Sequence, residues 1–130
     1  MWKEALRDFT YAASLKSDYE APRIGKALVQ YQLSQKQEAI AYFQLLTSKY
    51  PRFADGQAAL AVMLYSDKKN VEDALDRWEI ALEEDSRYFD VDWVENIRRW
   101  PPALVDDLKV FKTMISTKSD EGRYQDSMQL

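Results

Sequence analysis

The chain has 130 residues, of which 46% are hydrophobic, and its three Gly and four Pro leave few interruptions of regular structure. This composition is typical of one folded domain with a buried core. The 22 acidic and 18 basic residues give a net charge of −4, which disfavours nucleic acid as a partner because a phosphate backbone selects a basic surface. The absence of Cys and His excludes thiol chemistry, Cys/His zinc sites and histidine acid–base catalysis. The longest apolar run, residues 58–65, is far shorter than the ~20 residues that span a bilayer.

A short pattern occurs three times along the chain, at intervals of 34 residues (Ala5 to Ala39) and 35 residues (Ala39 to Ala74). An acidic residue and an Ala are followed by an aromatic residue four positions after the Ala, and then by a small or apolar residue. The three copies are Glu4-Ala5-Leu6 with Phe9 and Ala12, Glu38-Ala39-Ile40 with Phe43 and Leu46, and Asp73-Ala74-Leu75 with Trp78 and Ala81. A repeat of this length predicts pairs of helices stacked into a solenoid.

The apolar periodicity predicts where these helices lie. The expected helices cover residues 2–16, 21–33, 36–49, 54–65 and 71–84. Pro22 suits the first turn of the second helix, and Pro51 ends the third. Residues 67–70 are expected to form the turn before the fifth helix.

The repeat pattern fades after Ser86, and a different segment follows. A sixth helix is predicted over 92–100, with three apolar residues on one face: Trp93, Ile97 and Trp100. Pro101-Pro102 breaks it, because the residue before a proline is pushed out of the helical region. A seventh helix is predicted over 103–115, with one apolar stripe: Leu104, Leu108, Phe111 and Ile115. The polar residues 116–130 are predicted to form a flexible tail.

The repeat resembles the tetratricopeptide repeat, in which small residues let helices approach closely and aromatic residues fill the space between pairs. The resemblance covers residues 1–86 and implies an all-α, right-handed solenoid closed by a C-terminal pair of capping helices. The second repeat departs from the pattern, since either Gly25 or Ala27 can be its small first-helix residue. The start at Trp2 resembles the second helix of a repeat, so we expect the chain to belong to something longer. The expected units are a truncated repeat 1–17, repeats 20–52 and 53–86, a helical cap 89–115 and a polar tail 116–130.

Tetratricopeptide solenoids bind extended or helical segments on the concave face made by the first helix of each pair. The matching residues here are Ile24, Leu28, Tyr31, Ala58, Val62 and Tyr65. This apolar lining with two Tyr predicts an amphipathic or apolar partner segment. Two alternatives are that these residues are plain core, or that the last helix folds back over them. Some members clamp acidic chaperone tails, but the lining offers no side chain that donates to a carboxylate at 24, 28, 58 or 62.

Residues 92–102 are similar to the extension after the repeats in some tetratricopeptide proteins of chloroplasts and cyanobacteria. The resemblance implies a peripheral subunit or assembly factor of a photosynthetic membrane complex, associated with the chloroplast thylakoid; the alternative location is the cytoplasm. Trp and Arg are enriched at interface hot spots. We therefore expect a protein partner to contact four residues of this segment: Trp93, Arg98, Arg99 and Trp100. The two Arg can also act simply by facing the negative end of a helix.

The sequence as a whole predicts a non-catalytic scaffold for protein–protein interaction, with no cofactor, no metal and no nucleic acid, and with peripheral membrane contact at most. The alternatives are a generic cytosolic adaptor and a regulatory or localisation domain of a larger enzyme. Ser66 and Lys69 have the spacing of a serine acyl-enzyme motif, but they lie in a predicted turn without the partner motifs. Adjacent acidic residues at 83–85 and 106–107 are interpreted as solvated surface, since sequence neighbours on a helix point apart.

Overall fold

The computed structural model describes residues 1–15, 20–68 and 70–128, and for residues 13–15, 68 and 118–128 it describes the backbone alone. Within this part of the chain all regular structure is helical, as the sequence predicts. The elements are α1 (Trp2–Leu15), α2 (Glu20–Gln32), α3 (Lys36–Lys49), α4 (Ala54–Met63), a π-helical turn η1 (Leu64–Lys68), α5 (Val71–Glu84), a 3₁₀ turn η2 (Ser86–Phe89), α6 (Val91–Asn96) and α7 (Pro102–Met128).

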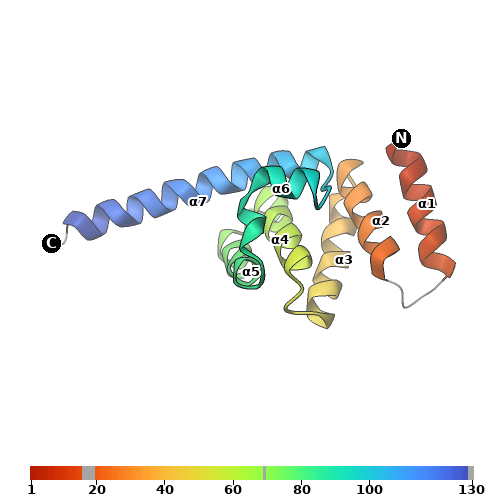
Figure 1. Cartoon of the computed structure of the whole chain (residues 1–130), viewed down its shortest axis with the longest axis horizontal. Helices are drawn as coiled ribbons and strands as arrows, with labels where there is room; N and C mark the ends of the chain where they lie inside the picture. Colours follow the sequence, from red (N-terminus) through yellow and green to blue (C-terminus); the bar gives the residue numbers. More distant parts are fainter. Residues whose placement is uncertain (16–19, 69, 129–130) are drawn as a thin grey trace.

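Helices α1 to α5 lie side by side in chain order, each packed on the next (Figure 1). The predicted bounds of the third and fifth helices agree with α3 and α5. Local chemistry sets these ends: Pro51 follows the end of α3, and the side chain of Asn70 accepts a hydrogen bond from the backbone N–H of Asp73 at the start of α5. The predicted fourth helix ends earlier as an α-helix, at Met63, and continues as the wider turn η1.

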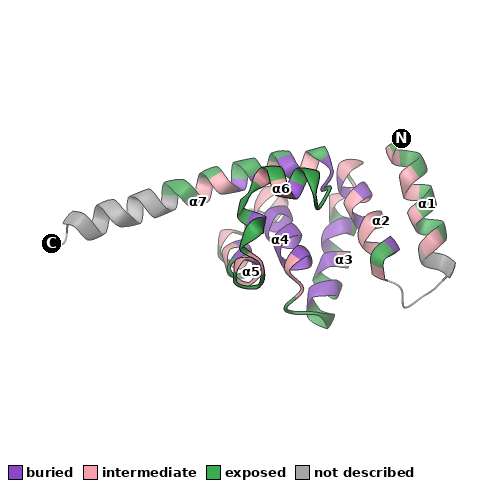
Figure 2. Ribbon diagram, in the orientation of Figure 1, coloured by how far each residue is buried: buried purple, intermediate pink, exposed green. Residues whose placement is uncertain are grey.

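The small and aromatic positions of the second and third copies of the pattern lie in the core, whereas those of the first copy, Ala5 and Phe9, are half-buried. Ala39, Phe43, Ala74 and Trp78 are all buried, which confirms their predicted burial. Between them lies α4, whose residues from Asp55 to Met63 are all buried (Figure 2). A helix enclosed on every side needs small side chains, and four of these nine residues are Ala or Gly.

Both small residues of the second repeat have a packing role. Ala27 is buried in the main core. Gly25 faces the ring of Phe9 on α1, and a Cβ built on it would lie 2.6 Å from Cζ of that ring. The sequence leaves open which of the two is the small first-helix residue of the repeat. In the structure Gly25 lies against α1 and Ala27 lies in the core.

The predicted sixth helix over 92–100 is wrong in its second half. Helix α6 ends at Asn96, and Arg99 has a left-handed backbone conformation with φ 57°. Ile97 and Trp100 therefore do not share a face, since Ile97 is 65% exposed and Trp100 is 3% exposed. The residues before Pro101 and Pro102 cannot continue a helix, so the chain turns there and α7 begins at Pro102.

The predicted flexible tail is also wrong for residues 116–128, because α7 continues as one helix to Met128. The distal part of α7 extends beyond the stacked helices (Figure 1). No proline occurs after Pro102, so no residue of this segment breaks the backbone hydrogen-bond ladder. Residues 129–130 lie outside the described residues. Among the described residues, none of the helices combines the length and the hydropathy that crossing a membrane requires.

Candidate interaction surfaces

The face predicted to bind a partner is covered by the chain's own last helix. The first part of α7 lies across α2 and α4. The backbone N–H of Ala103 donates to Oε1 of Gln32 at 2.8 Å, and the hydroxyl of Tyr31 donates to the Asp107 carboxylate. Further along, the rings of Phe111 and Tyr65 lie with their centroids 5.3 Å apart. Burial and the Asp107 carboxylate raise the pKa of Tyr31, which therefore stays a neutral hydrogen-bond donor.

This arrangement matches the alternative in which the last helix folds back over the expected binding residues. Of the six residues, three are fully buried: Tyr31, Ala58 and Val62. The other three are half-buried: Ile24, Leu28 and Tyr65. From α7, three fully buried side chains complete the layer: Leu104, Leu108 and Phe111. Burial of this extent is what an integral part of a core shows, so a partner segment could enter here only by displacing α7.

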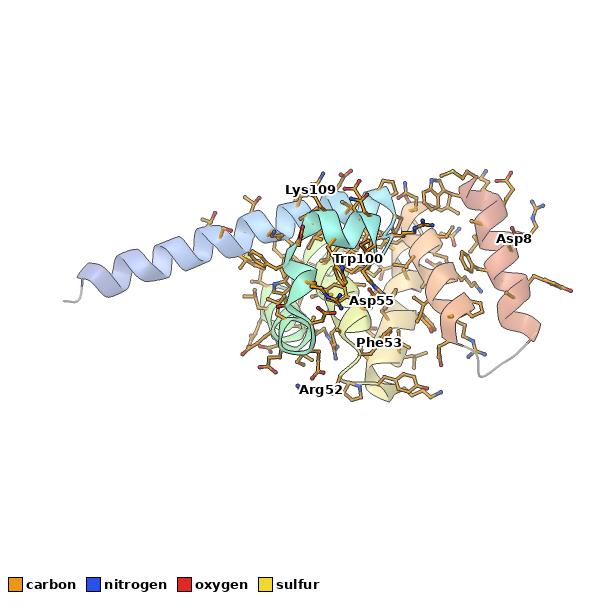
Figure 3. All side chains as sticks on the ribbon, viewed as in Figure 1. Asp8, Arg52, Phe53, Asp55, Trp100 and Lys109 are labelled. Atoms are coloured by element: carbon orange, nitrogen blue, oxygen red, sulfur yellow. The ribbon has the colours of Figure 1, made fainter. Side chains whose placement is uncertain are left out.

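A buried carboxylate organises the segment that was expected to carry the second contact. Asp55, in the first turn of α4, is 4% exposed. Its Oδ1 accepts hydrogen bonds from the Tyr88 hydroxyl at 2.7 Å, from Nε of Arg98 at 3.2 Å and from Nε1 of Trp100 at 3.2 Å. Asp55 and Trp100 are labelled in Figure 3. Three donors and one positive charge offset the cost of burying this carboxylate, and together they fix the C-terminal segment to the start of α4.

The four residues expected to face a partner therefore separate into two groups. Trp100 is buried and Arg98 is paired with Asp55, so both hold the chain together. Trp93 is half-buried: its ring meets the Tyr88 ring edge-on at 5.0 Å, and the Arg87 guanidinium lies 4.6 Å from its centroid. Arg99 is exposed. Sequence reasoning missed Asp55, although an acidic residue at the start of an otherwise small and apolar helix is a signal for it.

An open hollow runs along α2 and α3, and none of its described lining residues belongs to α7. We name it the α2–α3 furrow. Its apolar end has a volume of 350 Å³. Two further hollows, of 290 and 300 Å³, continue it through shared lining residues. The apolar and aromatic lining consists of Ile24, Tyr42, Leu45, Leu46, Tyr50 and Phe53. The charged and polar lining consists of Glu20, Arg23, Lys26, Gln30, Glu38 and Lys49.

Glu20 is the best-satisfied charge of this furrow. Its carboxylate accepts a hydrogen bond from the Tyr42 hydroxyl at 2.5 Å and lies 3.5 Å from Nζ of Lys49 and 3.8 Å from Nη1 of Arg23. Burial and this carboxylate raise the pKa of Tyr42. The side chain of Leu45 is 72% exposed beside these groups.

Within the described residues, no group of three or more Asp and Glu side chains is placed so that it could hold a metal ion. Three comparisons with known proteins complete this picture. No family model, no curated protein and no solved structure matches the chain.

Proposed function

We propose that the chain is a non-catalytic protein-interaction module of the tetratricopeptide class, built as a right-handed stack of helix pairs with a C-terminal helical cap. One observation carries the proposal. The same two positions of consecutive repeats, Ala39 with Phe43 and Ala74 with Trp78, are buried in the same way although they lie 35 residues apart. Equivalent burial at a fixed period is what stacked repeats require, and stacked helix pairs of this length serve mainly as binding surfaces.

The experiment is capture followed by reconstitution. The immobilised full chain is incubated with cell extract, the retained proteins are identified by mass spectrometry, and the best candidates are purified and titrated by calorimetry. We expect at least one to bind the folded chain with a fixed stoichiometry, and not to bind the Phe43→Ala variant, whose core is emptied. If no purified candidate binds at micromolar concentration, the proposal is wrong.

A narrower version places the module on a photosynthetic membrane complex, as a peripheral subunit or assembly factor. Its support is the resemblance of residues 92–102, in which Val94 and Trp100 are buried. Core packing accounts for these two residues without a partner. Capture from solubilised thylakoids, compared with an extract of non-photosynthetic tissue, tests this version. Photosystem subunits should be recovered from the first alone; equal recovery of unrelated proteins from both extracts favours the generic cytosolic adaptor or the accessory domain of a larger enzyme.

A further inference from the structure

We infer that the α2–α3 furrow is the docking site of an acidic amphipathic segment of a partner protein. This inference rests on the proposed interaction function and specifies its surface and the chemistry of its partner. Helix α7 covers part of the face that the family resemblance favours. The furrow includes Ile24 of that expected face, and none of its described lining residues belongs to α7.

The furrow offers an anchor site for an apolar side chain. Ile24 of α2, Leu46 of α3, and Tyr50 and Phe53 of the segment after α3 line the hollow of 350 Å³, which is wide enough for a Leu or Phe side chain. Leu45 adds an exposed apolar rim beside it. An apolar side chain that enters this hollow removes its own surface and that of the lining from water, which is the main favourable term in association.

The part of the chain that forms the furrow has an excess of positive charge, although the chain as a whole is acidic. Residues 1–52 contain eight Lys and Arg against five Asp and Glu, whereas residues 53–107 contain six against fourteen. In the furrow, Glu20 is already paired by Arg23 and Lys49. Among the described residues no ion pair is found for Lys26 or for Glu38. The charged lining as a whole has three cations, from Arg23, Lys26 and Lys49, against the two carboxylates of Glu20 and Glu38, which leaves a net positive charge for a ligand carboxylate. Acidic groups of the partner therefore find complementary charge next to the apolar anchor.

A second copy of the chain that docked through α5 would fit this furrow less well than a separate partner. The acidic outer face of α5 offers Glu72, Asp76 and Glu79 at helical spacing. None of the exposed large apolar side chains belongs to α5, however, so this helix lacks an anchor for the hollow. A partner helix with carboxylates on one face and Leu or Phe on another provides both, as helix-in-groove recognition requires.

The test uses the full chain and two labelled helical peptides that carry Leu on one face and either Glu or Lys on the other. Fluorescence anisotropy should show binding of the Glu peptide, with a Kd that rises with salt, and at least tenfold weaker binding of the Lys peptide. Leu45→Asp and Lys26→Glu should each weaken the Glu peptide at least tenfold. The matched control is Val110→Asp, at an exposed apolar position of α7, which should leave the Kd unchanged. Circular dichroism melts verify that each variant is folded.

Three results would overturn the inference. Equal binding of both peptides would show that the furrow is not a docking site for an acidic segment. An unchanged Kd for folded Leu45→Asp would show the same. Concentration-dependent dimerisation in sedimentation velocity that Leu45→Asp abolishes would assign the furrow to a second copy instead. If Leu45→Asp still captures the natural partner as the wild type does, this inference fails while the proposed function stands; if neither chain binds any purified candidate, the proposed function fails with it.

Discussion

Gly25 is a close contact between α1 and α2, because the ring of Phe9 lies where a Cβ would be. Gly25→Ala raises helix propensity by about 1 kcal/mol. We nevertheless expect a net loss of about 1–3 kcal/mol in the free energy of unfolding, because the methyl group displaces the ring. Chemical denaturation measures this loss. In a Phe9→Leu background the same substitution should be neutral or stabilising, and additive effects of the two changes would contradict the contact.

Asp55 is the residue on which the C-terminal segment depends, since it accepts from Tyr88, Arg98 and Trp100 at one oxygen. Asp55→Ala should lower the free energy of unfolding by about 3 kcal/mol, because it leaves buried donors unpaired and removes the charge opposite Arg98. Asp55→Asn, which keeps an acceptor, should cost less. The control is Glu84→Gln, which weakens a surface pair with Arg52 and should stay within about 0.5 kcal/mol. Equal stability of Asp55→Ala and the control would show that the cluster contributes nothing.

Helix α7 combines a buried face and an exposed face at neighbouring positions, which allows its packing role to be tested directly. Phe111 is fully buried against Tyr65 and Trp78, whereas Val110 is 59% exposed. Phe111→Ala should cost about 3–5 kcal/mol, the usual range for emptying a large aromatic site, and Val110→Ala should be close to neutral. Thermal and chemical denaturation of the two variants measure the difference. Similar stabilities would mean that α7 is only loosely attached to α2 and α4.

The turn between α6 and α7 places Arg99 in the left-handed region, with φ 57°. A side chain is disfavoured there, so Arg99→Gly should raise the free energy of unfolding by about 1 kcal/mol. Arg99→Ala keeps the Cβ and should give no such gain, which makes it the control for loss of the charged side chain. An equal effect of both changes in denaturation would contradict the backbone explanation.

The whole molecule should lose stability at alkaline pH, because three of its tyrosine hydroxyls donate hydrogen bonds to carboxylates. Burial raises the pKa of Tyr31, Tyr42 and Tyr88, each of which donates to a carboxylate. A folded-state pKa above that of the unfolded chain, about 10, means that the stabilisation is complete below pH 10 and falls as pH rises towards the folded values. Denaturation midpoints measured between pH 8 and pH 11 should decline above about pH 10. In Tyr31→Phe the decline should be smaller, and a decline identical to the wild type would contradict this cause.

Local signals along the chain were sufficient for most of the helical array. Apolar residues at helical spacing, Pro51 after α3 and the cap Asn70 before α5 act over one or two turns, so the bounds of α3 and α5 could be predicted. The same reasoning failed for α6, because its expected apolar face assumed that the helix continues past Asn96. It also failed for the polar end of α7, since polarity alone does not break a helix.

The fold class and the period of the core were thus fixed by short-range patterns that any reader of the chain can find. Which residues stay exposed could not be predicted in this way, because that depends on contacts between residues that are remote in sequence. Tyr31 and Asp107 are 76 positions apart, and Asp55 and Trp100 are 45 positions apart. Their contacts place α7 over the expected binding face and leave the α2–α3 furrow open. Each apolar face can pack on several others, and only the three-dimensional arrangement decides which two faces meet. The pattern along a single helix does not contain that information.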